Sequence, residues 1–438
     1  MQTYRCLFFE RTSKIAERSL YEIYDLAADY SALSKIDTTG ESDDNQVTLR
    51  TTFGSAASHN GRACTDLNWS PHKLELFVCA YADTPRIGGP TNAEPDGIVA
   101  VWNVNVPSSP EFVFYCQSAV MSVSFSPYRP SLIVGTLYTG LIVVWDMSSA
   151  SGPVQRTPVQ RSKLSKKSST KMHGHSHPVY CQGWVGTQNA HNLITVCNDG
   201  KLCVWNPDNI DEPIEAQDLK RSALNSNLPV TSIAFADGEM SEFVVGGEDG
   251  GLYAVPRYVI NPKQRHNDTG STAMKPKKFE DVHYGPVLGL SSHPRKGEVD
   301  LSDLILSCSA DWTLKLWHKS TQKSIITFED SADYVYDVAW SPVHPTVFAS
   351  IDGASNLSLW NLLSSQEVPV KTEVVNADGA ALNCIEWNAN GTRVMVGDSV
   401  GRCHLFDIGE AFCKPREDSW TALRDMVREL LADNATAS

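Results

Sequence analysis

A three-part phrase recurs seven times between Cys64 and Asp407, and this repeat constrains the fold more than any other feature of the chain. Each copy is an apolar strand that often ends in Ser-Pro, then a second strand, a tight turn and a third strand. Two clear copies begin with VMSVSFSP at Val120–Pro127 and with VYDVAWSP at Val335–Pro342. Apolar alternation interrupted by Gly and Asp turns is typical of short antiparallel strands. The chain is therefore expected to be all-β.

An aromatic residue ends the third strand in most copies and sets the length of the repeat. Six copies end in Trp102, Trp145, Trp205, Trp317, Trp360 and Phe406, and a degenerate seventh ends in Val255. Four strands with a terminal Trp per unit are typical of WD40 blades, so we predict a seven-bladed β-propeller. The run VTLRTTF at Val47–Phe53 is placed to form the outer strand of the last blade and close the ring, the alternative being a plain surface strand.

The repeats divide the chain into three parts. Residues 1–46 are expected to hold an N-terminal helix and linker, 47–410 the propeller, and 411–438 an amphipathic C-terminal helix. Phe8–Tyr30 has a broadly amphipathic pattern, and Ser419 can cap a C-terminal helix whose apolar residues share one face. We expect that last helix to lie on the outside of a blade, the alternative being contact with a partner helix.

Charge is distributed unevenly. The chain carries a net charge of −14, which argues against nucleic-acid binding by the whole protein. Two stretches, Arg156–Lys171 and Arg257–Lys278, are basic and fall in insertions near residues 150–175 and 256–279. They are interpreted as solvated loops. The alternative is contact with an acidic partner surface, tuned by phosphorylation of serines within Ser162–Ser169.

The sequence contains no recognisable catalytic motif. It lacks the phosphate-binding GxxxxGK[ST], the GxSxG elbow and HExxH. The histidine cluster at His173–His177 matches the Gly-His dipeptide of many WD repeats, so His175 is expected to be structural, as is His283. The sequence predicts a protein that is not an enzyme and has no catalytic residues and no cofactor.

The 11 cysteines are scattered singly, without CxxC spacing. They are interpreted as small buried hydrophobic residues in a reducing compartment, with no metal site. Neither a secretory signal nor an apolar run long enough to span a membrane is visible, so no membrane insertion is expected.

Several segments resemble the cytoplasmic dynein intermediate chain family. They include EPDGIVAVWNV at Glu94–Val104, the long run at His177–Asn206 and FEDSADYVYDVAWSPVHP at Phe328–Pro345. The resemblance spans essentially residues 8–430 and includes details outside the repeat pattern, such as VGTQNAHN at Val185–Asn192. It implies a non-catalytic motor subunit in the cytoplasm, associated with microtubules, whose propeller docks on the dynein heavy-chain tail and links motor to cargo.

The resemblance is incomplete at the N-terminus. Family members usually carry a long extension with a coiled coil for dynactin and short segments for dimeric light chains. No Lys-x-Thr-Gln-Thr motif and no charged heptad run is present here. The sequence therefore predicts binding to the dynein heavy chain and other dynein subunits, but not to dimeric light chains or dynactin.

Three alternatives remain open from the sequence. A ciliary or axonemal dynein intermediate chain is the nearest one. A substrate receptor of a ubiquitin ligase is another, although the Trp-Asp-x-Arg typical of such receptors is missing. The third is an RNA- or phosphate-binding scaffold, although neither basic stretch has the interleaved aromatics that stack on bases.

One turn suggests where a partner binds. Five residues before the terminal residue of each repeat stand Gly97, Gly140, Gly200, Gly250, Gly401 and Ser355, but Trp312 in the fifth repeat. Glycine is expected there because such turns often need a positive φ. We predict that Trp312, Lys315 and Tyr334 form part of the heavy-chain docking surface. The alternative is that Trp312 packs on its own blade.

Overall fold

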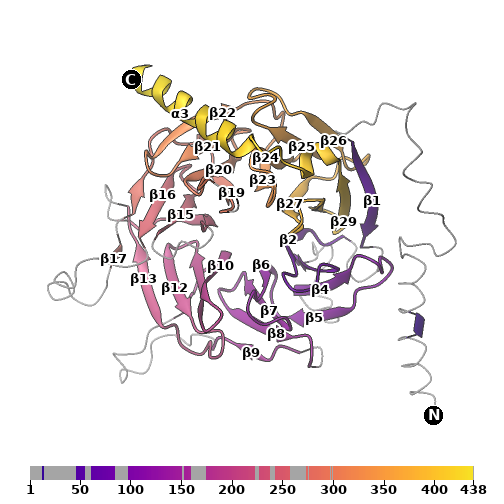
Figure 1. Ribbon diagram of the computed structural model, residues 1–438. Coiled ribbons are helices and arrows are strands. Elements are labelled where there is room, and N and C mark those ends of the chain that lie inside the picture. The colour runs from indigo at the N-terminus through magenta and orange to yellow at the C-terminus, as the bar shows by residue number, and fades with distance from the viewer. Residues whose placement is uncertain are drawn as a thin grey trace, which may run out of the picture.

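The computed structural model describes residues 12–13, 46–54, 61–83, 97–149, 152–158, 174–221, 226–236, 242–256, 273–274, 276–295, 297 and 299–437. These residues form seven sheets arranged around a central axis like the blades of a propeller (Figure 1). Each blade runs from an inner strand near the axis to an outer strand at the circumference, and its first three strands are consecutive in the chain and neighbours in the sheet. The predicted seven-bladed WD40 β-propeller is confirmed.

The first three blades follow the repeats of the sequence. Blade 1 contains β2 (Cys64–Trp69), β3 (Leu76–Tyr81), β4 (Gly97–Asn103) and β5 (Phe112–Cys116). Blade 2 contains β6 (Val120–Phe125), β7 (Leu132–Leu137), β8 (Ile142–Asp146) and β9 (Gln155–Arg156). Blade 3 contains β10 (Val179–Thr187), β11 (Ala190–Cys197), β12 (Lys201–Trp205) and β13 (Glu215–Leu219), with β17 (Ala273–Met274) parallel to β13.

The other four blades have four strands each. Blade 4 contains β14 (Val230–Ala234), β15 (Glu242–Gly247), β16 (Leu252–Pro256) and β18 (Lys277–Lys278). Blade 5 contains β19 (Val287–Ser292), β20 (Leu304–Ser309), β21 (Leu314–His318) and β22 (Lys323–Phe328). Blade 6 contains β23 (Val335–Trp340), β24 (Val347–Asp352), β25 (Asn356–Asn361) and β26 (Lys371–Val374). Blade 7 contains β27 (Leu382–Trp387), β28 (Arg393–Asp398), β29 (Cys403–Ile408) and β1 (Val47–Phe53).

Strand β1 closes the ring as the outer strand of blade 7, as the sequence predicts. It pairs antiparallel with β29 and so covers the edge that β29 would otherwise expose. The Phe53 ring lies 5.0 Å from the Phe77 ring and 5.8 Å from the Trp102 ring, centroid to centroid, and both partners belong to blade 1. The N-terminal strand therefore completes the last blade and also packs against the first.

Hydrogen bonds of the terminal Trp residues explain the constant spacing between the second and third strands in three blades. Three indole N–H groups donate to a hydroxyl ten residues earlier on the second strand of the same blade. The pairs are Trp205–Thr195 at 2.8 Å, Trp317–Ser307 at 2.8 Å and Trp360–Ser350 at 3.0 Å. A buried indole N–H needs such an acceptor. Where the third strand ends in Phe406 or Val255, which have no side-chain N–H, the equivalent positions hold Val396 and Val245.

Blade 2 departs from this rule. Gly135 stands ten residues before Trp145, so no hydroxyl is present there, and the buried indole N–H of Trp145 has no hydrogen-bond partner among the described residues. A Cβ on Gly135 would lie 2.6 Å from the Trp145 ring, which fills the space of the missing side chain. Blade 2 has therefore exchanged a buried hydrogen bond for closer packing of the indole.

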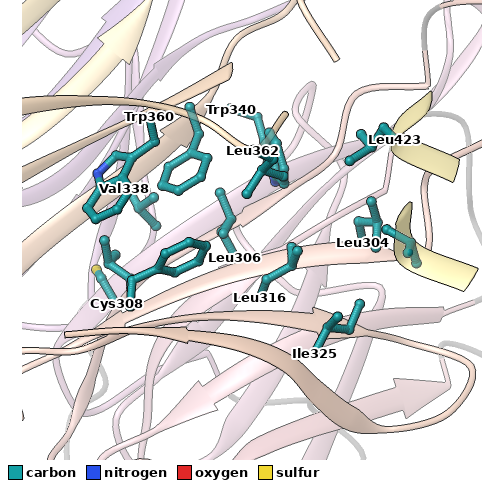
Figure 2. Close-up of a cluster of buried hydrophobic side chains, with 14 of the residues drawn as sticks. Leu304, Leu306, Cys308, Leu316, Ile325, Val338, Trp340, Trp360, Leu362 and Leu423 are labelled. Carbon is teal, nitrogen blue, oxygen red and sulfur yellow. The ribbon is translucent and has the colours of Figure 1, made fainter. Parts of the chain in front are cut away.

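The C-terminal helix lies on the outside of blades 5 and 6. Helix α2 (Glu410–Cys413) follows blade 7, and α3 (Ser419–Ala437) runs across these two blades and passes β22 (Figure 1). Leu423 and Val427 are buried in one cluster with residues of blades 5 and 6, and Figure 2 shows Leu423 near Leu304 and Leu362. The apolar face of α3 is therefore covered by the propeller. Among the described helices, none is long and apolar enough to cross a membrane.

The predicted cap at Ser419 is wrong. Ser419 is the first residue inside α3, and its hydroxyl accepts a hydrogen bond from the Arg416 N–H at 3.1 Å. The carbonyl of Asp418 accepts the first helical hydrogen bond, from the Ala422 N–H, so Asp418 precedes the helix. The hydroxyl thus holds the turn before the helix.

Several predicted segments lie outside the described residues. The N-terminal helix at Phe8–Tyr30 does so apart from residues 12 and 13, as do residues 159–173 and 257–272 of the two basic insertions. Only the ends of the two basic insertions belong to described strands: Arg156 is the last residue of β9, and Lys277–Lys278 forms β18.

Candidate docking face

One face of the propeller carries the exposed aromatic side chains. We call it the hairpin face. It bears the turns between the second and third strands of each blade and the loops that lead from an outer strand to the next blade. Among the described residues, the exposed large aromatics are all at this face: Tyr115, Tyr138, Tyr284, Trp312 and Tyr334. The exposed aliphatic residues of the connecting loops are on the opposite face: Leu74, Val154, Ile214, Leu363 and Val368. The two faces thus differ in chemistry.

Trp312 occupies the glycine position of its turn with the backbone that the position requires. Its φ is 69°, close to the 73° of Gly200 and the 76° of Gly250. Ser355, the other non-glycine residue at this position, has a φ of 68°. Gly97 is the exception to the alignment, because it opens β4 without a positive φ. A left-handed conformation is unfavourable for a bulky residue, so a Trp held there is an unusual feature of the fold.

A hydrogen-bond network below Trp312 fixes this turn. His283 is buried, and its Nε2 lies 2.6 Å from the Ser307 Oγ, which also accepts from the Trp317 indole. His283 Nδ1 lies 3.1 Å from the Asp311 carboxylate, and Asp311 also accepts from the Thr313 hydroxyl at 2.7 Å. Burial alone would raise the pKa of Asp311, but the bonds from His283 and Thr313 outweigh it and hold that pKa below its usual range. The charged carboxylate therefore anchors the turn.

The same carboxylate positions a second aromatic residue. The Tyr284 N–H donates to the Asp311 Oδ2 at 2.9 Å, and the Tyr284 side chain is 98% exposed. Trp312, the residue after Asp311, is 50% exposed. One buried His-Asp pair thus presents two adjacent aromatic residues to solvent from a fixed backbone. The sequence analysis missed Tyr284, although a residue next to a histidine that points into the blade is expected to point outward.

The other two residues predicted for the docking surface differ in exposure: Tyr334 is open to solvent, whereas Lys315 contacts the backbone of a neighbouring loop. Tyr334 is 47% exposed, and its ring lies 6.4 Å from that of Tyr336 in a T-shaped arrangement. The Lys315 Nζ lies 3.4 Å from the carbonyl oxygens of both Asp281 and Val282, and 5.7 Å from the Trp317 ring centroid. The Lys315 ammonium group therefore contacts the backbone of the loop that carries Tyr284, whereas the Tyr334 side chain is exposed to solvent. We call Tyr284, Trp312, Tyr334 and Tyr336 the aromatic patch.

Acidic residues are frequent in the two loops that carry Tyr284 and Tyr334. The loop before blade 5 contributes the exposed Glu280 and Asp281, and the loop before blade 6 contributes Glu329, Asp330 and Asp333. Glu280 pairs with Lys323, with 3.3 Å between the charged atoms. These two loops therefore combine aromatic rings with acidic residues, which favours a partner surface that carries apolar and basic groups.

The structural histidine of blade 3 has a smaller network than that of blade 5. The His175 Nε2 lies 2.6 Å from the Thr195 Oγ1, as expected, but within the described part of the chain its buried Nδ1 has no partner. Asp199 of that blade instead accepts from Asn227, at 3.1 Å. Burial lowers the pKa of His175 to about 3, so the ring stays neutral. His175 and His283 both form hydrogen bonds within their blades, as predicted. Of the two, only His283 also bonds to a carboxylate, that of Asp311.

Three carboxyl groups on neighbouring inner strands titrate abnormally. Asp66 on β2 accepts from Ser122 and Val123 of the next blade, Asp337 on β23 accepts from Ile385, and Glu386 is on β27. Burial raises the pKa of Asp66 to about 6 and that of Asp337 to about 7. Burial also raises the pKa of Glu386 well above its usual value. These groups join adjacent blades and are protonated more readily than in the unfolded chain.

We predict a pH dependence of stability from these groups. Because the folded pKa of Asp337 is about 7 and the unfolded value about 4, its stabilising contribution falls as pH rises through this window. Between pH 5.5 and 7 the wild type should lose about 1 kcal/mol more unfolding free energy than Asp337→Asn. Denaturant unfolding of both proteins at several pH values measures this difference. The contribution of His175 to the pH dependence of stability is the same in both proteins, so it cancels in the comparison. Parallel pH profiles for the two proteins would contradict the expectation.

Two comparisons relate the chain to known proteins. A family model described as PAC11 dynein intermediate chain matches residues 134–386. Over 425 residues the chain is 37% identical to the cytoplasmic dynein 1 intermediate chain of Drosophila melanogaster. This match covers 97% of the present chain and 60% of the Drosophila protein. The chain therefore spans about 60% of the length of this curated relative.

Proposed function

Because this chain belongs to the dynein intermediate chain family, we propose that it is a non-catalytic subunit of a cytoplasmic dynein motor. In this proposal its propeller docks on the tail of the dynein heavy chain, beside other dynein subunits, and helps to join the motor to its cargo. The protein would act in the cytoplasm on microtubule-associated complexes. Similarity to a cytoplasmic intermediate chain favours this role over a ciliary or axonemal one.

The observation that carries the proposal is the aromatic patch on the hairpin face. Trp and Tyr are enriched among the residues that dominate binding energy at protein interfaces, where each can contribute about 2 kcal/mol or more. Tyr284 and Trp312 are presented by a turn that Asp311 already holds in place, so docking costs little side-chain and backbone ordering. We propose that Trp312 and Tyr334 contact the heavy chain, joined by Tyr284, and that Lys315 supports the loop that carries Tyr284.

Removing the Trp312 ring should weaken docking without harming the fold. In Trp312→Gly the turn keeps its positive φ, which glycine adopts without strain, so the backbone is expected to relax. We expect the affinity for heavy chain to fall about 30-fold, the equivalent of about 2 kcal/mol. Quantitative mass spectrometry of heavy chain that copurifies with the tagged full chain measures the loss.

The matched control is Tyr138→Ala, which removes another exposed aromatic from the hairpin face, in the corresponding turn of blade 2. It should leave recovery of heavy chain unchanged. A thermal transition at or above that of wild type shows that Trp312→Gly is folded. If that folded variant recovers heavy chain as well as wild type does, the aromatic patch is not the docking site.

A further inference from the structure

Four cysteines that lie singly along the sequence meet where the last blade packs on the first. Cys64 and Cys79 belong to β2 and β3 of blade 1, and Cys384 and Cys403 to β27 and β29 of blade 7. The Sγ–Sγ distance is 3.0 Å between Cys64 and Cys79. It is 3.4 Å both from Cys64 to Cys384 and from Cys79 to Cys403. The sulfur atoms of Cys64, Cys79 and Cys403 all lie within 4.8 Å of one another.

The surroundings of this cluster are closed to solvent. Cys64, Cys79 and Cys403 are 0% exposed and Cys384 is 4% exposed, within a core that also holds Tyr81, Trp102 and Leu405. Gly397 on β28 leaves the room that the sulfur atoms occupy. A Cβ there would lie 2.5 Å from the Cys64 Sγ and 2.7 Å from the Cys384 Sγ. Strands from two blades thus converge on one small group of thiols.

We propose that these thiols form a closed site for one thiophilic d10 metal ion, Zn²⁺ or Cu⁺, which links blade 7 to blade 1. Thiolate ligands select these ions over hard cations. A Zn–S bond of about 2.3 Å in a tetrahedral site places sulfur atoms about 3.8 Å apart. The three spacings given above are shorter than this by less than about 1 Å, so these sulfur atoms must move apart by that amount to admit the ion. Four thiolates suit Zn²⁺, whereas the three mutually close ones suit Cu⁺.

Metal binding replaces protons on the sulfur atoms. Four thiols and one Zn²⁺ give a tetrathiolate complex and release four protons, and three thiols and one Cu⁺ release three. Because the sulfur atoms are enclosed, the ion enters during folding and exchanges slowly afterwards.

Metal content of the full-length chain tests the proposal. The protein is produced with added Zn²⁺, and separately refolded with Zn²⁺ or with Cu⁺ under reducing, oxygen-free conditions. Inductively coupled plasma mass spectrometry of the folded monomer then counts the ions. We expect about one ion per chain and a higher thermal midpoint for the loaded protein than for the metal-free one.

Variants identify the ligands and the ion. Cys403→Ser, with Cys403→Ala as an apolar second variant in case the serine destabilises the fold, should contain almost no metal. Cys308→Ser changes another buried cysteine, in blade 5 outside the cluster, and should keep a full ion. Loss of metal in Cys384→Ser indicates the four-thiolate Zn²⁺ site, and retention of Cu⁺ indicates the three-thiolate site. A metal-free wild type after both preparations, or equal metal in folded Cys403→Ala and wild type, overturns the proposal.

Discussion

Replacing Val47–Phe53 with a Gly-Ser segment of the same length is expected to abolish cooperative unfolding of the whole propeller. The change removes the pairing of β1 with β29 and opens the edge of blade 7. It also removes Phe53 from between Phe77 and Trp102, so the contact of the last blade with the first is lost. Because domains are stable by only about 5–15 kcal/mol, loss of a whole strand and its burial is enough to unfold the ring. Calorimetry and gel filtration of the purified chain would show no sharp transition and a larger radius.

Two point variants on the same strand separate its contributions. Phe53→Ala removes a ring that is 1% exposed and should cost about 3–5 kcal/mol of unfolding free energy. Leu49→Ala changes a side chain that is 51% exposed and should change stability by less than about 0.5 kcal/mol. Chemical denaturation measures both. Similar losses in the two variants would mean that β1 does not close the ring through Phe53.

The sequence predicted those parts of the fold that repeat. The terminal residues located the third strand of every blade, including the degenerate copy that ends in Val255. They do so because each terminal side chain is buried in the core, so an apolar residue recurs at this position. Val47–Phe53 was found because a ring of four-stranded blades lacks one outer strand when the last repeat supplies only three. The exposed Trp312 stood out because its turn position otherwise holds glycine or serine.

The sequence did not predict contacts between residues far apart in the chain. Cys64 and Cys384 are 320 positions apart, and only closure of the ring brings their sulfur atoms within 3.4 Å. Lys315 was expected in the docking surface, but its place under the Tyr284 loop depends on how two loops meet. Periodicity reports which way a side chain points within its strand, and it carries no information on which residues of other blades that side chain meets.

The buried histidine of blade 5 should matter more to stability than its counterpart in blade 3. His283→Ala leaves the Asp311 carboxylate without its buried partner and removes a bond to the Ser307 hydroxyl. His175→Ala removes one bond, to Thr195, since no residue that the structure describes bonds to the other ring nitrogen of His175. Hydrogen bonds to charged groups contribute about 1.5–3 kcal/mol each, against about 1 kcal/mol for neutral ones. We therefore expect His283→Ala to cost about 2 kcal/mol more unfolding free energy than His175→Ala.

The comparison also links stability to docking. The two substitutions remove the same side chain from equivalent positions in two blades, so the loss of packing is similar. The difference between their unfolding free energies therefore measures the contribution of the hydrogen bond to the Asp311 carboxylate. Because Asp311 holds both the Tyr284 backbone and the turn that carries Trp312, His283→Ala should also reduce recovery of heavy chain at temperatures where the protein remains folded. His175→Ala leaves the aromatic patch intact and should bind as wild type does. Equal denaturation midpoints for the two variants would show that the hydrogen bond between His283 and Asp311 stabilises neither the blade nor its turn.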